Sequence, residues 1–557
     1  MTMKAGSAPG KPSLDVPLSS VTVFVGPNNS GKSRALQEIE MWITTPHYKE
    51  GTVIKSVEFE PWQADDLERA MQELEVAPRP NEAVNPGHVL IERFNARTNS
   101  TARHQLDKRS LLSQAQSPNG GRNYYCTLLS LFTLKLDGAN RLALVNPMAA
   151  GDLLSSPANH LQYLFLNNDA RMKLRQIAFE AFEKYLVIDP TQIGQLRLRL
   201  SPRAPLDERE EKGWDSTSVA FHRQAAPVVE ASDGVKAFVG ILSTIIAGEP
   251  KVTIIDEPEA FLHPALSFKL GKEVTTAMRA TDKRLFVATH SASFLTGCVQ
   301  AGAPINIVRL TYDYDTATAR LLPPEQLAPL MRNPLLRSVG VLNALFYNAV
   351  VVTEADADRA FYQEINERLL AQNDRRGIAS CLFLNAQNKQ TVWDIVKPLR
   401  ELGIPAAGVV DIDVLKEGGA VWMKPLEGAF LPALSHASLQ ADRKAILDAF
   451  TATPPKDMKR DGGIGLLSKD DQEACRSLFK RLAEYGVFVV ERGELESWLP
   501  DLGVPRTKGT WLPTIFAKMG DEPGRANYLE PGEGDVWDFI GDIRSWAADA
   551  NRKGIPE

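Results

Sequence analysis

The stretch Val21-Thr-Val-Phe-Val-Gly26-Pro-Asn-Asn-Ser-Gly31-Lys32-Ser33 decides the fold class of this chain. Its first residues are β-branched and aromatic and end at Gly26, which is typical of a buried strand that leads into a loop. From Gly26 onward the sequence matches the pattern G-x-x-x-x-G-K-[ST], and we expect a helix from about Lys32. The stretch therefore predicts a strand, a phosphate-binding loop and a helix.

Each residue type in this loop has a chemical role. Glycines let the backbone curl so that successive N–H groups face a phosphate, and the start of the helix adds a favourable dipole. Lys32 can reach the β- and γ-phosphates of a nucleotide, and the Ser33 hydroxyl can ligate Mg²⁺. An ordinary glycine-rich turn is the alternative. The residues expected to bind nucleotide are Gly26, Asn28, Asn29, Ser30, Gly31, Lys32 and Ser33.

A second strand, Val252-Thr-Ile-Ile255, leads into Asp256 and Glu257. We expect Asp256 to hold magnesium through water and Glu257 to orient or deprotonate the attacking water. A third strand, Leu285-Phe-Val-Ala288, leads to His290, which we expect to contact the γ-phosphate. Acidic residues at a strand end also fit a solvated turn, and a lone histidine also fits a surface position. Both assignments therefore depend on the upstream phosphate loop.

The composition fits a soluble protein of several domains. The chain has 557 residues, of which 44% are hydrophobic and 24% are charged, so we expect three or four compact units and no general disorder. The net charge of -6 excludes a uniformly basic nucleic-acid binder, and any such contact requires a local basic surface. The four cysteines lack metal-site spacing, and no stretch approaches the roughly 20 apolar residues of a membrane span. We expect a cytoplasmic protein without membrane contact.

Acidic residues also follow strands in the C-terminal half. Glu354 and Asp358 come after the strand Ala349–Thr353, and they are placed on one face at the start of a helix. Asp411 and Asp413 follow another strand as D-x-D. Carboxylates that converge at one sheet edge repel one another unless divalent cations neutralise them. The pattern predicts a site for Mg²⁺ or Mn²⁺ suited to two-metal phosphodiester chemistry, although each fragment alone also fits a helix start or a turn.

The order of the first set of motifs resembles the ABC-type ATPase heads of SMC and RecF proteins. The phrase Asp256-Glu-Pro-Glu-Ala-Phe-Leu-His263-Pro264 is especially similar to the overcoming-lysogenisation-defect (OLD) nucleases. Residues 231–235, Ala-Ser-Asp-Gly-Val, then resemble a diverged ABC signature, in which Ser232 and Gly234 would act on nucleotide held by a partner head. This resemblance implies a homodimer or a higher even oligomer with ATP at the interface. Ser-Asp-Gly is also an ordinary turn and helix start.

The C-terminal acidic motifs resemble a TOPRIM domain, whose E-G-x-x-D motif would be carried by Glu354 and Asp358 and whose D-x-D motif by Asp411 and Asp413. Ala355 departs from that motif, because glycine normally follows the first glutamate and a Cβ atom there could crowd the loop. A weakened or degenerate metal site is therefore an alternative.

The TOPRIM resemblance implies further residues later in the domain. Glu494 and Glu496 lie in a segment similar to one that carries another acidic ligand, and we favour Glu496 as the metal ligand. A lysine near the end of such domains offsets charge in the transition state, and we favour Lys518 over Lys508 for this role. Lys389 would contact phosphate at the same sheet edge.

Together these resemblances imply an OLD-family, Gabija-type ATPase–nuclease and cover most of the chain. We expect an α/β fold in which an ABC-type P-loop ATPase head is interrupted by a largely helical insertion and followed by a C-terminal TOPRIM domain with a helical end segment. Prolines in residues 321–340 mark a domain boundary, and residues 453–471 predict a mobile surface loop. The expected parts are 1–60 and 215–335 for the head, 61–214 for the insertion with a dimerisation role, and 336–557 for the TOPRIM domain.

The resulting hypothesis is an ATP-hydrolysing, metal-dependent endonuclease with DNA as substrate, ATP and Mg²⁺ or Mn²⁺ as cofactors, and a dimeric ATPase that controls the TOPRIM site. The resemblance implies antiphage defence with a partner protein encoded beside it. The alternative is an ABC-class ATPase sensor or scaffold whose TOPRIM-like domain is inactive and binds a partner or nucleic acid. A topoisomerase or primase fits less well, because the C-terminal half lacks room for strand-passage or priming machinery.

Overall fold

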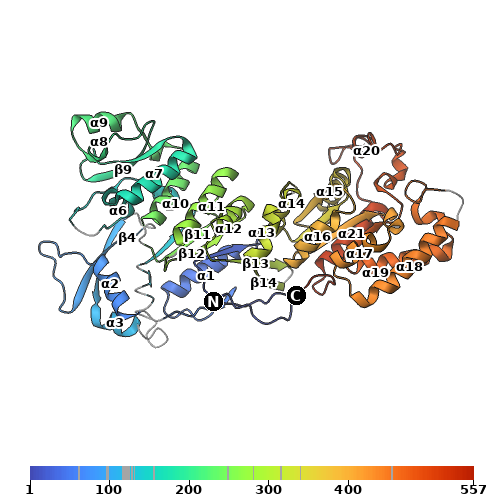
Figure 1. Cartoon of the computed structure of the whole chain (residues 1–557), viewed down its shortest axis with the longest axis horizontal. Coiled ribbons are helices and arrows are strands. Elements are labelled where there is room, and N and C mark those ends of the chain that lie inside the picture. The colour runs from blue at the N-terminus through green and yellow to red at the C-terminus, as the bar shows by residue number, and fades with distance from the viewer. Residues whose placement is uncertain are drawn as a thin grey trace. The chain divides into compact units, whose positions relative to one another are not determined.

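The computed structural model (Figure 1) describes residues 1–556 except 61–62, 96–99, 116–125, 127–128, 131, 139, 155–156, 248–249, 280, 314–315, 339 and 453–455. The chain forms two compact units. The first consists of Met1–Gly6, Pro12–Val25 and Gly31–Leu310, and the second consists of Ser7–Lys11, Gly26–Ser30 and Thr311–Glu557. Within the described residues, no helix is both long and apolar enough to cross a membrane.

A six-stranded sheet contains the first set of predicted strands, in the order β14-β13-β2-β12-β11-β6. The pairs β13–β2, β2–β12, β12–β11 and β11–β6 are all parallel. Every residue of β2 is buried, which explains its continuous apolar run. This sheet confirms the predicted α/β class. Its strands are β2 (Val21–Val25), β6 (Thr133–Leu136), β11 (Val252–Asp256), β12 (Arg284–Ala288), β13 (Ile305–Asp313) and β14 (Thr316–Leu322).

Helices α1 (Lys32–Thr44), α10 (Asp233–Ile246), α11 (Pro264–Met278) and α12 (Ala292–Gln300) belong to the same unit, and Figure 1 shows the last three beside β11 and β12. Glycines allow α11 and α12 to approach closely. A Cβ atom on Gly271 would overlap the Phe294 carbonyl, and one on Gly297 would overlap the Phe268 carbonyl. This close packing places the start of α12, next to His290, close to α11.

The region between α1 and α10 contains strands as well as the expected helices. Leucines alternate with arginines from Gln195 to Ser201, a period-two pattern that forms β9 and that a helical interpretation missed. In addition, the segment that was expected to be a largely helical insertion contributes β6 to the six-stranded sheet. Besides β6, the described elements include β3 (Ile54–Ser56), α2 (Ala64–Leu74), β4 (His88–Asn95), β5 (Ser100–Asp107), α3 (Lys108–Ala115), α5 (Asn140–Ala143), β7 (Met148–Ala149), α6 (His160–Leu166), α7 (Asn168–Phe182), β8 (Tyr185–Asp189), β9 (Gln195–Ser201), α8 (Glu208–Lys212), α9 (Ser216–Arg223) and β10 (Ala226–Pro227).

The second unit contains a four-stranded parallel sheet in the order β16-β15-β17-β18. The strands are β15 (Ala349–Thr353), β16 (Cys381–Asn385), β17 (Ala406–Asp411) and β18 (Val487–Val490), and two of them, β15 and β17, are the predicted strands that precede the acidic motifs. The helices are α15 (Asp356–Ala371), α16 (Val392–Glu401), α17 (Gly419–Gly428), α18 (Ala433–Ala452), α19 (Lys469–Ala483), α20 (Trp511–Met519) and α21 (Asp535–Ala548).

Two short helices begin within residues 321–340, the segment that was expected to mark a domain boundary. Pro324 begins α13 (Pro324–Arg332) and Pro334 begins α14 (Pro334–Ser338). Proline is favoured at the first position of a helix, where its missing N–H would have no partner. The two compact units divide after Leu310, earlier in the chain than the expected boundary.

Candidate functional site

The predicted phosphate loop connects β2 to α1. Asn29 and Gly31 have φ angles of 61° and 93°, so both adopt the left-handed conformation. A Cβ atom on Gly31 would also lie 3.2 Å from the Val53 side chain, which gives a second reason for glycine. Lys32 begins α1 and is only 5% exposed. Burial lowers the pKa of Lys32 to about 8, although the carboxylates of Glu257 and Asp256 act in the opposite direction.

Ser33 and Asp256 meet although they are far apart in the sequence. The Ser33 hydroxyl donates a hydrogen bond of 3.1 Å to Asp256 Oδ1. Burial raises the pKa of Asp256, and this hydrogen bond partly opposes the shift. The contact brings together the hydroxyl and the carboxylate that were predicted to share one magnesium ion.

Glu257 and His290 also lie at this sheet edge. Glu257 has a φ of 50°, and its N–H donates to Ala288 O at 2.8 Å. His290 Nε2 lies 3.7 Å from Glu257 Oε1, and burial lowers the pKa of the imidazole. The structure thus brings together both residues that were expected to act at the γ-phosphate.

Two residues of this site were missed. The half-buried Glu259 carboxylate accepts the His290 N–H at 2.7 Å and fixes the backbone that carries the imidazole. Arg141, on α5, donates to the carbonyl oxygens of Asp256 and Glu257. Glu259 was visible in the acidic motif, but no local pattern identifies Arg141, which lies 115 residues before Asp256.

The predicted signature lies at the start of α10. Ser232 precedes the helix, and a Cβ atom on Gly234 would lie 2.7 Å from Phe261 O. Glycine is therefore required here by packing within the chain. Action of Ser232 and Gly234 on nucleotide in a partner head stays a prediction.

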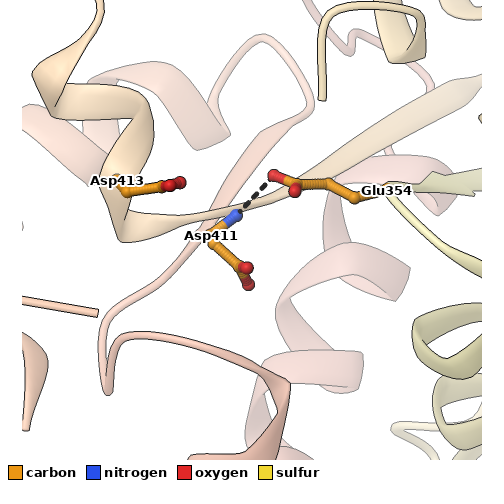
Figure 2. Close-up of side chains that lie close together, drawn as sticks. All are labelled: Glu354, Asp411 and Asp413. Carbon is orange, nitrogen blue, oxygen red and sulfur yellow. Dashed lines mark hydrogen bonds between the residues drawn. The ribbon is translucent and has the colours of Figure 1, made fainter. Parts of the chain in front are cut away.

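Three of the C-terminal carboxylates converge (Figure 2). One oxygen from each of Glu354, Asp411 and Asp413 lies within 4.8 Å of those from the other two. The Asp411 N–H donates to Glu354 Oε1 at 3.0 Å, which ties the end of β17 to the residue after β15. Buried Asp413 Oδ1 has no hydrogen-bond partner among the described residues. This set of hard oxygen donors with an unpartnered atom fits Mg²⁺ or Mn²⁺.

Asp358 is not part of this group of three. Its Oδ2 accepts the Ala355 N–H at 3.1 Å and caps α15. Burial raises the pKa of Asp358 to about 7, and the charge of Asp411 adds to this effect. Ala355 has a φ of -133°, which any residue adopts, and its side chain is exposed. Alanine in place of the usual glycine therefore does not strain the loop.

Two lysines contact the acidic group. Lys459 Nζ lies 2.5 Å from Asp411 Oδ2 and 3.7 Å from Asp413 Oδ2. Burial opposes the charge of Lys459, but the two carboxylates prevail and raise the pKa of its ammonium group. Lys389 Nζ lies 3.3 Å from Asp413 Oδ2 and 2.5 Å from Glu417 Oε1. Lys389 was expected at this edge, whereas Lys459 was missed because its segment was interpreted as a mobile loop.

The residues predicted near the end of the domain, Glu494, Glu496 and Lys518, lie at different distances from the acidic group of Glu354, Asp411 and Asp413. Glu496 is near enough for its charge to raise the pKa of both Asp411 and Asp358. Glu494 is buried and lies 3.9 Å from Lys508 Nζ. Lys518 is exposed on α20 and has no ion pair within the described part of the chain. Its transition-state role stays a prediction without support from the geometry.

Comparisons with known proteins bear on the first unit. Residues 79–296 match the family described as "AAA domain, putative AbiEii toxin, Type IV TA system". This range includes Asp256, Glu257 and His290 and excludes the phosphate loop. No curated protein matches the chain.

Three similar solved structures are SMC heads. The Smc head bound to the C-terminal winged-helix domain of ScpA is 12% identical, with 59% of this chain and 98% of that chain covered and a TM-score of 0.33. The SMC head domain from Thermotoga maritima is 13% identical, with 58% and 97% covered and a TM-score of 0.28. The ScpA-bound Smc head with an extended coiled coil, from Pyrococcus furiosus, is 11% identical, with 59% and 97% covered and a TM-score of 0.30.

Proposed function

We propose that the first unit is an ABC-type ATPase head. The observation that carries this proposal is the contact between Ser33 and Asp256 beside the buried Lys32. Lys32 would bind the phosphates, and Ser33 and Asp256 would hold Mg²⁺, which when bound neutralises phosphate charge. Glu257 would orient the attacking water, and His290 would contact the γ-phosphate.

Nucleotide binding and turnover by variants test this proposal. Glu257→Gln should bind a fluorescent ATP analogue as wild type does and lose at least about a hundredfold of its hydrolysis rate. Lys32→Ala should lose binding itself. Glu427→Gln is a matched control, because Glu427 is exposed on α17. Unchanged hydrolysis in Glu257→Gln would exclude the role given to Glu257.

We further propose that the second unit is a TOPRIM-type, divalent-metal-dependent nuclease acting on DNA. Its support is the convergence of Glu354, Asp411 and Asp413. These residues would hold Mg²⁺ or Mn²⁺, which when bound polarises a phosphodiester and activates water. The contact between Asp411 N–H and Glu354 keeps the two acidic residues in register. Lys389 contributes positive charge close to a phosphate entering this edge.

Cleavage assays with supercoiled, linear and single-stranded DNA, and with RNA, test the nuclease. Wild-type protein with Mn²⁺ should cut DNA, and Asp411→Asn should abolish cleavage while ATP hydrolysis stays within about twofold. Asp470→Asn is the control, because Asp470 is exposed at the start of α19. Assays with and without ATP show the direction of coupling. Protein that binds Mn²⁺ but cuts none of these substrates would favour the alternative sensor or scaffold, which the position of Asp358 outside the group also favours.

The ABC-type resemblance supports a homodimer or higher even oligomer assembled on ATP, with residues 61–214 contributing to dimerisation. Mass photometry of Glu257→Gln should then show an ATP-dependent doubling of mass that Ser232→Arg abolishes, because Ser232 is exposed. We also propose a role in antiphage defence together with a partner protein. Phage plating on cells that express the chain, with and without its neighbouring genes, tests that role.

A further inference from the structure

Glu38 is a charged residue on the buried face of α1. The other residues of this face include Ala35, Ile39 and Trp42, which are apolar, and Glu38 itself is completely buried. A buried carboxylate is costly unless it is hydrogen-bonded or paired. The phosphate-loop pattern ends at Ser33 and makes no demand on this position. The partners of Glu38 therefore show what the charge does.

The Glu38 carboxylate binds the backbone of the loop that leads into β3. The N–H groups of Thr52, Val53 and Ile54 donate to it at 2.6, 3.0 and 2.9 Å. Arg34 Nε donates to it at 2.8 Å from the preceding turn of α1. Burial opposes the negative charge, but the hydrogen bonds from the three backbone groups prevail and lower the pKa of Glu38. The ionised carboxylate thus holds three consecutive backbone groups in place.

This loop, residues 51–54, is held from two sides, and we call it the anchored loop. A Cβ atom on Gly51 would overlap the Glu38 carboxylate, so the chain approaches Glu38 as closely as glycine allows. From another direction, the backbone N–H of Lys4 donates to Val53 O at 2.8 Å. The anchored loop therefore has little freedom to move while Glu38 is in place.

The anchored loop packs against the phosphate loop. A Cβ atom on Gly31 would lie only 3.2 Å from the Val53 side chain, so Val53 occupies the space beside the last glycine of the phosphate loop. Gly31 has a φ of 93° and no side chain that could restrict its own backbone. Lys32 and Ser33 follow it directly. The Val53 side chain thus limits the backbone at the point where the phosphate-binding residues begin.

We propose that Glu38 is a positioning residue for nucleotide binding, which holds the phosphate loop in its receptive conformation through the anchored loop and Val53. The inference rests on the proposed ATPase function of the first unit. Glu38 is completely buried and does not touch nucleotide itself. Its loss therefore weakens nucleotide binding and leaves the hydrolysis of bound ATP, which Glu257 and His290 serve, nearly unchanged.

Two measurements on the full chain test the inference: equilibrium binding of a fluorescent ATP analogue, and single-turnover hydrolysis at saturating protein. Glu38→Gln places an amide N–H against backbone N–H groups, so it should weaken binding by about tenfold and keep the hydrolysis rate within about twofold. Val53→Ala should weaken binding similarly, and the double variant should be no weaker than the weaker single variant, because both act through one contact. Thr52→Ala is the control, because it keeps the backbone N–H and changes only an exposed side chain.

The outcomes separate this inference from the proposed ATPase. If Lys32→Ala loses binding while Glu38→Gln and Val53→Ala bind as wild type does, the inference is wrong and the nucleotide site stands. A lower thermal midpoint with unchanged affinity would likewise reduce Glu38 to a structural anchor, and multiplying effects in the double variant would show that the two residues act separately. If Glu38→Gln does not fold, unchanged affinity in Val53→Ala overturns the inference by itself. Wild-type affinity in Lys32→Ala would instead remove the nucleotide site.

Discussion

Replacing Asp358 with asparagine should stabilise the metal-free protein at about pH 8. Burial and the charge of Asp411 raise the pKa of Asp358 to about 7. When the folded-state pKa of a carboxyl group is raised, the native state binds the extra proton, so stability falls as pH rises from about 4 to about 7. Above about pH 7, Asp358 is ionised in the folded wild-type protein, and its buried charge lowers the free energy of unfolding by the full amount. Asparagine removes the charge and keeps an oxygen that can accept the Ala355 N–H.

The expected change in the free energy of unfolding is the gain from removing a buried charge minus the loss of a favourable charge at the start of α15. A shift from 3.8 to about 7 corresponds to at most about 4 kcal/mol. Asp358 is partly exposed, so solvent screening reduces this gain to about 1–2 kcal/mol. Loss of a negative charge in the first turn of α15 costs about 0.5 kcal/mol. The net gain is about 1 kcal/mol at the higher pH and close to zero well below pH 3.8, where the carboxyl group is protonated in both states.

Urea unfolding in the presence of a chelator measures this difference. Tryptophan fluorescence includes a signal from the second unit, because Trp498 is buried there and donates to the Tyr362 hydroxyl at 2.9 Å. With a slope of about 2–3 kcal/mol per molar urea, the midpoint should rise by about 0.3–0.5 M at the higher pH. Asp470→Asn serves as the control. A midpoint that is unchanged or lower in Asp358→Asn at about pH 8 would refute the reasoning.

Three further substitutions test contacts in the two units. Arg400 is completely buried and donates to five backbone carbonyl oxygens, so Arg400→Met should lower the free energy of unfolding by roughly 3–5 kcal/mol, measured by urea unfolding. Arg141→Lys should slow ATP turnover by about tenfold with little change in nucleotide affinity. The two terminal nitrogens of the arginine guanidinium group bind the carbonyl oxygens of Asp256 and Glu257 at the same time, and the single ammonium group of lysine cannot reproduce this geometry. Gly463→Ala should lower the thermal midpoint and reduce Mn²⁺ affinity, since its Cβ atom would displace the segment of Lys459.

Local sequence was enough to predict the elements that carry the chemistry. Val21–Val25 and Ala349–Thr353 are largely apolar runs rich in β-branched residues, and every residue in both strands is buried. The carboxyl ends of parallel strands in one sheet meet at the same edge, so motif order alone predicted that Ser33 and Asp256 would belong to one site.

Residues that reach a site from distant segments could not be predicted in this way. Arg141 arrives on a four-residue helix, and Lys459 lies in a segment whose glycines and prolines indicated a surface loop. Neither position has a periodicity or spacing that identifies it, because a long side chain needs only its charged end near the oxygen atoms that it contacts.

The sequence by itself determined which chemical groups follow the buried strands, because a strand and its terminating loop are local patterns. Only the tertiary structure decided which of those groups meet. It joined Asp413 to Glu354 and Asp411, used Asp358 as a helix cap, and brought Lys459 to Asp411. The physical reason is that ionic contacts depend on separation in space, and here sheet register and close glycine contacts set that separation.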